Sequence, residues 1–244
     1  MTIGSSPALS LDEAIHSTSS EVLKGALTEP GFDEDLALAL LKRADVPAEI
    51  LEQLSKQGAL MKSRKVKLAL VSHPRTPRHV SVPMVRHLFT FDLMKVALGP
   101  AVPADIKMAA DETVIRRVET ITIGERQTLA RRASGRVAGA LLLDPEARVM
   151  RVALENARLT ESAVLKPLMR QDVPAALVDA VSRHRRWSVR REIRIALLRN
   201  EKTPMARAVE FARSLPAREL RHILRGSRLP ANIKKLLLKE LDRQ

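Results

Sequence analysis

Cysteine is absent from this 244-residue chain, and aromatic residues make up only 2% of it, as four Phe, one Trp and no Tyr. Without cysteine the chain has no disulfide, no thiolate nucleophile and no cysteine-based zinc site. The scarcity of aromatics argues against a β-sandwich or barrel, because such folds depend on aromatic and β-branched side chains. Leu, Ala, Arg and Lys, which favour helices, are abundant instead. The composition therefore predicts an all-α fold.

Long hydrophobic runs are also missing. No apolar stretch approaches the ~18 residues that a membrane-spanning helix requires. The first twenty residues lack the basic region and the apolar stretch of a secretory signal peptide. We therefore predict no membrane span and a cytoplasmic location.

Signatures of catalysis are missing as well. The chain contains neither GxxxxGK[ST] nor GxGxxG, and no HExxH. Its six histidines do not cluster, and the acids of 33–35 follow Pro30-Gly31, where they suit the first turn of a helix. The sequence predicts no enzyme, no cofactor and no metal site.

A short pattern recurs through the whole chain: a basic residue, any residue, then Ala or Leu. Its third position falls at 26, 69, 109, 153, 196 and 237, in steps of 43, 40, 44, 43 and 41 residues. A fixed period of this length is the signature of a helical repeat protein. We predict about five to six stacked repeats of about 42 residues.

Helix breaks follow the repeat. His73-Pro74-Arg75-Thr76-Pro77 matches Asn200-Glu201-Lys202-Thr203-Pro204, and Asn156 begins a looser copy. Asn or His suits a helix C-terminus, Thr an N-cap and Pro the first helical position. Val-Pro-Ala or Leu-Pro-Ala marks five further helix starts. Together these marks predict eleven or twelve helices of 8–14 residues.

The segment 142–154, LLDPEARVMRVAL, resembles a HEAT repeat. The family's pattern is Asp-Pro, then Val-Arg, then Ala; Met150 stands where the family usually has Arg. The helix breaks also resemble those of leucine-rich-repeat-variant proteins. The resemblance implies a right-handed α-solenoid with an extended binding surface over residues 21–244, preceded by a loose segment, 1–20. It implies no reaction, and one Trp is too few to hold a flipped base as HEAT-like DNA glycosylases do.

Charge is distributed unevenly around a net value of +14. Residues 1–60 contain ten acids and four bases, whereas 61–244 contain 18 acids and 38 bases. A basic body attracts nucleic acid, anionic lipid or an acidic protein, but helices rich in Arg and Lys are also often merely solvated. Two arginine clusters stand out: one at 131, 132 and 136, and one within 183–194 that surrounds Trp187. Trp187 itself is expected to pack in the core.

The basic residue of each repeat, beginning with Lys24, lies about 200° around the helix from the packed Ala and should face outward. Stacked repeats would align these residues into one stripe, which is a binding groove on a concave face and a solvated ridge on a convex one. We predict a non-enzymatic scaffold that binds an acidic protein or peptide, with sequence-independent, salt-dependent nucleic-acid binding as the alternative. The predicted partner-binding residues are Lys67, Lys107, Arg148, Arg151, Arg183, Arg186, Arg190, Arg191, Arg194 and Lys235.

Overall fold

The computed structural model describes residues 10–241, and all regular structure within this range is helical, with no strand. The predicted all-α class is confirmed. The chain forms two compact units, 1–117 and 118–244, and each is described by itself. Of the predicted loose segment 1–20, residues 1–9 lie outside the described range, whereas Ser10 and Glu13 form a capping box for a short helix.

The first unit contains eight α-helices and one 3₁₀ helix among its described residues. They are α1 (Leu11–Ala14), α2 (Ser20–Thr28), α3 (Glu34–Leu41), α4 (Ala48–Lys56), η1 (Leu60–Lys62), α5 (Arg64–Ser72), α6 (Arg78–Val85), α7 (Thr90–Leu98) and α8 (Ala104–Arg117).

The second unit contains nine α-helices and two 3₁₀ helices among its described residues. They are η2 (Val118–Thr120), α9 (Ile123–Arg132), α10 (Gly135–Ala140), η3 (Leu141–Leu143), α11 (Ala147–Leu154), α12 (Glu161–Leu168), α13 (Ala175–Arg183), α14 (Arg191–Arg199), α15 (Met205–Arg213), α16 (Ala217–Arg225) and α17 (Ala231–Leu241).

Most helices start where the sequence places a cap or a proline. Ser63, Ser134 and Thr160 accept a hydrogen bond from the backbone three residues later. The prolines of the predicted starts, such as Pro47, stand at the N-cap, one residue earlier than we expected. Thr76 also differs from prediction, because its hydroxyl donates to the Leu70 carbonyl and so closes the preceding helix.

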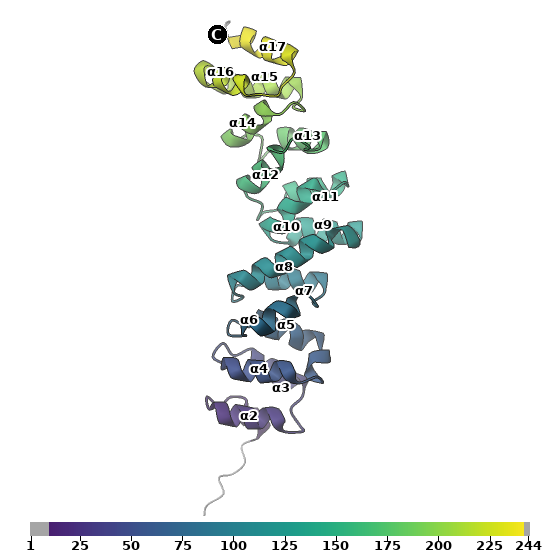
Figure 1. Ribbon diagram of the computed structural model, residues 1–244, viewed down its shortest axis with the longest axis vertical. Helices are drawn as coiled ribbons and strands as arrows, with labels where there is room; N and C mark the ends of the chain where they lie inside the picture. Colours follow the sequence, from purple (N-terminus) through teal and green to yellow (C-terminus); the bar gives the residue numbers. More distant parts are fainter. Residues whose placement is uncertain (1–9, 242–244) are drawn as a thin grey trace, which may run out of the picture. The chain divides into compact units, whose positions relative to one another are not determined.

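Many of the helices pack on the helix two places further along the chain. In the second unit, α9 packs on α11 and α11 on α13, while α10 packs on α12, α12 on α14 and α14 on α16. Figure 1 shows these two rows on opposite sides of that unit. In the first unit, α2 packs on α4 and α6 on α8, while α5 packs on both α3 and α7.

The motif predicted to mark a period of about 42 residues recurs at every third helix. Its third positions fall in α2, α5, α8, α11, α14 and α17, which is every third helix. The chain forms more and shorter helices than predicted, because both kinds of helix break act within each repeat. Within a unit, helices that lie two apart in the chain pack in the same row, whereas the motif recurs at every third helix. Successive helices that carry the motif therefore lie in different rows.

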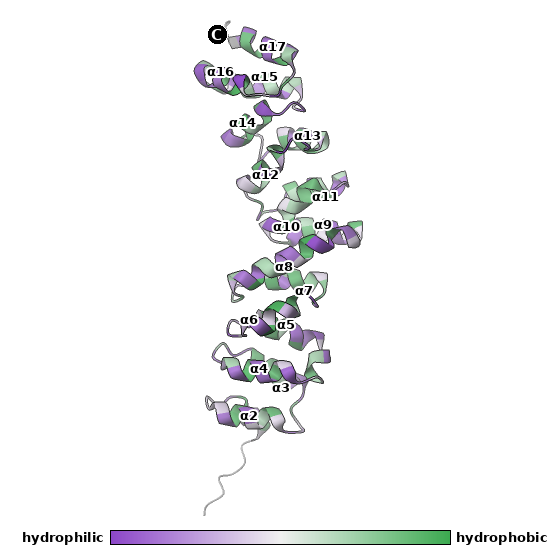
Figure 2. Cartoon of the chain, in the orientation of Figure 1, coloured by the Kyte–Doolittle hydropathy of each residue, from purple (hydrophilic) through white to green (hydrophobic). Residues whose placement is uncertain are grey.

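Each helix buries one face in the core of its unit. In α11, Val149, Met150, Ala153 and Leu154 are buried, whereas Arg151 is exposed. Figure 2 shows the same division of hydrophobic and hydrophilic residues along the other helices. Burying a Leu or Val side chain contributes about 1.5–3 kcal/mol, so this division holds the helices together.

Buried polar side chains join successive loops. His73, Asn156 and Asn200 each follow a helix, are at most 4% exposed, and accept a hydrogen bond from the backbone N–H two residues later. Each also donates to a carbonyl at the end of an earlier helix: His73 to Arg43 (2.7 Å), Asn156 to Ala130 (2.8 Å) and Asn200 to Leu168 (3.2 Å). His73, Asn156 and Asn200 therefore make equivalent hydrogen bonds, although one is a histidine and two are asparagines.

Basic side chains add a second set of bonds between loops. Arg75, Arg117, Arg186 and Lys202 each donate to a backbone carbonyl 29 or 30 residues earlier. Carbonyls at helix C-termini lack partners within the helix and favour a cation, so these bonds stabilise the loops. Part of the chain's positive charge is therefore structural.

Candidate functional site

The predicted arginine cluster of 183–194 divides into side chains that hold the fold and side chains that face solvent. Arg186 belongs to the first group. Its guanidinium donates to the carbonyls of Asn156 (3.0 Å) and Leu159 (2.8 Å) and stacks over Trp187, 4.3 Å from the ring centre. Trp187 is 1% exposed and donates to the Leu154 carbonyl at 2.9 Å, so it is a packing residue, as expected. Arg186 is therefore not a free cation.

Two further predicted residues, both on α14, are also engaged. Arg191 forms ion pairs with Glu192 and Glu219. Arg194 donates to the Ser188 carbonyl at 2.7 Å and lies over the ring of Phe211. Neither side chain is available to a partner without losing these contacts.

Three of the predicted binding residues in the second unit are exposed arginines with no ion pair or side-chain hydrogen bond within the described residues: Arg148 and Arg151 on α11, and Arg190 before α14. Arg185, in the loop after α13, shares this property. Arg185 belongs to the sequence cluster but not to the predicted binding set. Nothing in the sequence separates it from its neighbour Arg186, since only the fold shows which side chain turns toward the loop carbonyls.

A groove between α11 and α13, here called the α11–α13 groove, brings several of these residues together. It measures about 680 Å³. Its apolar floor is made of Ala147, Met150, Leu154, Ala176 and Ala180, and Arg151, Glu155, Asp179, Arg183, His184, Arg185 and Arg186 complete its lining. The floor is open because three of its five side chains are alanine. The groove thus joins an apolar surface to a predominantly basic rim.

The two acids on this rim neutralise part of its charge. Asp179 accepts from Arg183 at 2.9 Å, one helical turn away. Glu155 lies 3.2 Å from Nε2 of His184, although the contact lacks hydrogen-bond geometry. The His184 Nδ1 accepts from the Arg186 N–H, which fixes the orientation of the ring. Arg151 and Arg185 remain as the unpaired cations of the groove.

Within each unit, the basic residues of the predicted stripe lie on helices of different rows. In the first unit, Lys24 and Lys107 lie on α2 and α8, while Lys67 lies on α5, which packs in the other row. In the second unit, Arg151 lies on α11 and Arg194 on α14, again in different rows. The remaining member, Lys235, is exposed on α17, which packs on α15. None of the six is buried, but Lys24 pairs with Glu49 at 2.6 Å and the stripe is discontinuous.

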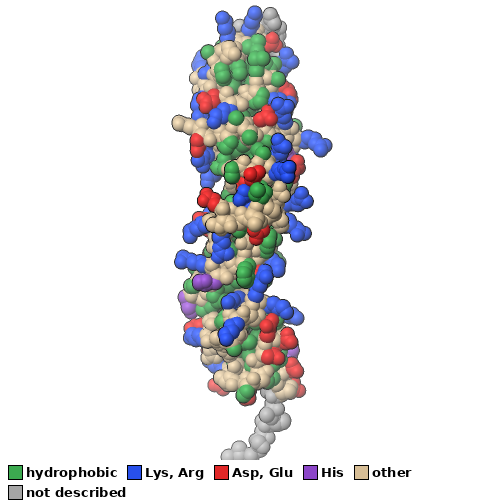
Figure 3. Space-filling model, turned by 90° about the vertical axis from the view of Figure 1, so that its right-hand side faces the viewer, with side chains coloured by type: hydrophobic (Ala, Val, Ile, Leu, Met, Phe, Trp, Pro, Cys, Tyr) green, Lys and Arg blue, Asp and Glu red, His purple; other side chains and the backbone are tan. Residues whose placement is uncertain are grey.

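Figure 3 shows one face of the molecule. Lys and Arg side chains are spread along each unit among Asp and Glu side chains, rather than gathered in one patch. The second predicted cluster is separate from the groove: Arg131 and Arg132 line a hollow of about 370 Å³ along α9.

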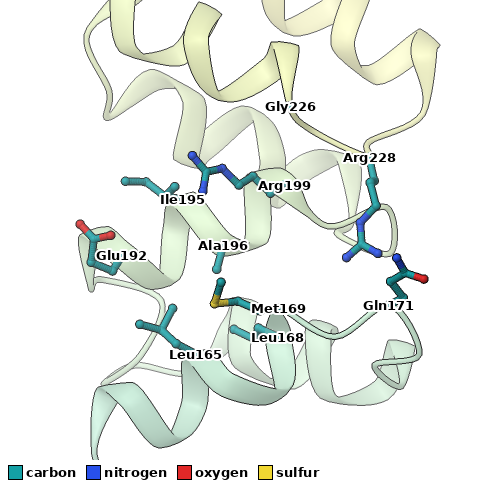
Figure 4. Close-up of a pocket in the computed structure, with 10 residues that line it drawn as sticks. All are labelled: Leu165, Leu168, Met169, Gln171, Glu192, Ile195, Ala196, Arg199, Gly226 and Arg228. Atoms are coloured by element: carbon teal, nitrogen blue, oxygen red, sulfur yellow. The ribbon is translucent and has the colours of Figure 1, made fainter.

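A second hollow, here called the α12–α14 hollow, lies in the other row of helices (Figure 4). It measures about 390 Å³ and is lined by Leu165, Leu168, Met169, Gln171, Glu192, Ile195, Ala196, Arg199, Gly226 and Arg228. Sequence reasoning missed it, because its apolar residues fit the ordinary helical pattern of a core.

Within 10–241, no group of three His, Cys, Asp or Glu side chains is placed to hold a metal ion. No helix in the same range is both long and apolar enough to cross a membrane.

Comparison of the chain with protein-family models, with curated proteins and with solved structures gives no match.

Proposed function

We propose that this chain is a non-enzymatic helical-repeat protein that binds an acidic segment of a partner protein through the α11–α13 groove. One observation carries the proposal: the groove combines an apolar floor with unpaired, exposed arginines, Arg151 and Arg185, and Arg148 lies one turn before Arg151 on α11. Arginine makes bidentate hydrogen bonds with carboxylates, and burial of a neighbouring aliphatic side chain against the apolar floor stabilises the complex.

The proposed architecture is a right-handed α-solenoid, which the resemblance to HEAT repeats implied. The packing of many helices on the helix two places further supports it within each unit. Its sequence unit of about 42 residues would then span three helices. A solenoid offers long rows of helices for binding and has no need of a deep active site.

Nucleic-acid binding through phosphates is the alternative, and the net charge of +14 favours it. Several features of the groove favour a protein. Its floor is apolar, its rim includes Glu155 and Asp179, and the nearby ring of Trp187 is buried and cannot stack on a base. Phosphate recognition would instead favour a continuous row of free cations.

The two functions are separated by a binding assay with defined probes. Fluorescence anisotropy would follow a fluorescein-labelled peptide of three Asp-Glu-Leu-Ser repeats, its Lys-Lys-Leu-Ser counterpart and a 16-base-pair DNA duplex. We expect the acidic peptide to bind more tightly than the duplex when both are measured at the same salt concentration. Tighter binding of the duplex, with an affinity that falls steeply with salt, would establish the alternative.

A further inference from the structure

The α12–α14 hollow contains the most exposed large hydrophobic side chain in the described part of the chain. Met169, the C-cap residue that follows α12, is 72% exposed. In Figure 4 its side chain points toward Ala196 on α14, and Leu165 lies beside it. Ile195 adds to the same apolar surface. Exposed apolar side chains that surround a hollow are typical of a binding surface, and methionine adapts its shape to a ligand.

The charges around this apolar surface are unequal. Arg199 is exposed, and its guanidinium has no ion pair or hydrogen bond within residues 10–241. Arg228 reaches the Arg170 carbonyl only at 3.4 Å. The acid of the hollow, Glu192, already accepts from Arg191 at 2.8 Å. Two weakly engaged cations therefore lie next to the apolar surface.

The neighbouring acid does not neutralise these cations. Asp172 accepts two hydrogen bonds from Arg170, at 2.9 and 2.7 Å, and these bonds lower the pKa of its carboxyl to about 2. The carboxylate of Asp172 is thus already paired with the guanidinium of Arg170 beside the hollow. Carboxylates that enter the hollow, one at each end, would meet Arg199 and Arg228 without competition from that acid.

We propose that the α12–α14 hollow is a second binding site, which takes an aliphatic side chain of a partner peptide together with the carboxylates that flank it. The aliphatic group contacts Met169, Leu165 and Ile195, and the flanking carboxylates accept hydrogen bonds from Arg199 and Arg228, whose guanidinium groups lie at different ends of the hollow in Figure 4. The site lies in the α10–α16 row, whereas the α11–α13 groove lies in the α9–α13 row. It is independent of the function proposed above.

Methionine-methyl NMR tests this proposal directly, because the chain has only eight methionines and one lies in each site. The Met169 signal reports on the hollow, and the Met150 signal reports on the α11–α13 groove. Each signal is assigned by substitution with Leu. The probes are three blocked tripeptides, N-acetyl-Glu-Leu-Glu amide and its counterparts with central Gly or with flanking Lys, and a single-stranded oligothymidine of eight nucleotides.

We expect Glu-Leu-Glu to shift the Met169 signal in a saturable way. The Gly and Lys counterparts should bind about tenfold more weakly, since each lacks one of the two complementary features. The variant R199E/R228E should abolish the shift. The matched control R218E/R225E, on exposed arginines of α16 that line neither site, should retain it.

Several results would overturn the proposal. These are a Met169 signal that stays fixed at millimolar probe, equal binding of the Gly or Lys peptide, an equal response to oligothymidine, or loss of the shift in the control variant alone. The Met150 signal keeps the two sites apart. If Met150 shifts and Met169 does not, the α12–α14 site is excluded and the α11–α13 groove is supported.

Discussion

Replacement of His73 tests whether the buried polar residues between loops are interchangeable. His73 is 4% exposed and makes two hydrogen bonds, one from Nε2 to the Arg43 carbonyl and one to Nδ1 from the Arg75 N–H. His73→Ala removes both and leaves the Arg43 carbonyl and the Arg75 N–H, which are partly buried, without these partners. At about 0.5–1.5 kcal/mol for each bond, with a further term for the space left by the ring, we expect a loss of about 2–4 kcal/mol.

His73→Asn should cost far less, because Asn156 and Asn200 make the same pair of bonds at equivalent positions. Its effect should also depend on pH. Burial, the largest cause, lowers the pKa of His73 below its usual value, and the charge of Arg75 lowers it further, against the opposing effects of the Arg43 carbonyl and Asp45.

A histidine whose pKa is lowered by folding binds protons more readily when unfolded, so it destabilises the fold as the pH falls below about 6.5. The wild-type chain should therefore lose stability relative to His73→Asn between pH 8 and pH 5.5. Urea unfolding followed by circular dichroism at both pH values measures the difference. Equal costs for the Ala and Asn variants, or a wild type that gains stability relative to Asn at low pH, would refute this reasoning.

Three further predictions concern the second unit, where fluorescence of the single tryptophan can follow urea unfolding. Asn200→Ala should lower the free energy of unfolding by about 1–3 kcal/mol through loss of its two hydrogen bonds, and no change would show that the bonds are not formed. Arg186→Ala should cost about 1–3 kcal/mol, whereas Arg185→Ala should change stability by less than about 0.5 kcal/mol; equal effects would contradict the division of the cluster. Arg126 and Asp144 form a buried ion pair at 2.9 Å that lacks hydrogen-bond geometry. Asp144→Asn should lower the free energy of unfolding by about 3 kcal/mol, because it leaves Arg126 without a charged partner. An unchanged free energy of unfolding would show that the pair does not contribute to stability.

The sequence predicted the helical class and many helix starts because both depend on local physical chemistry. Ser63 and Thr160 act as caps within their own segments, so their roles can be derived without tertiary structure. The repeat period was equally visible, but it gives no information on how many helices it contains. That number depends on whether the Thr-Pro breaks and the Val-Pro-Ala or Leu-Pro-Ala breaks each start a new helix, and here both do.

The arginine cluster could not be resolved from sequence for a different reason. Arg185 and Arg186 are adjacent and chemically identical, yet Arg186 donates to two loop carbonyls while Arg185 lines the groove. Which arginine is free depends on contacts with residues about 30 positions away. The same applies to Met169, whose exposure depends on how α14 packs on α12.

The most direct test of the proposed function is charge reversal at the α11–α13 groove. The variant R148E/R151E/R185E changes three exposed side chains that have no ion pair or hydrogen bond within the described residues, and the matched control R218E/R225E/K239E changes the net charge equally on α16 and α17. Anisotropy titration of the labelled acidic peptide should show affinity at least about tenfold weaker for the groove variant and nearly unchanged for the control, since three favourable charge contacts become repulsive only in the groove. Equal affinity in the two variants, with helicity and melting temperature preserved, would contradict the assignment of binding to this groove.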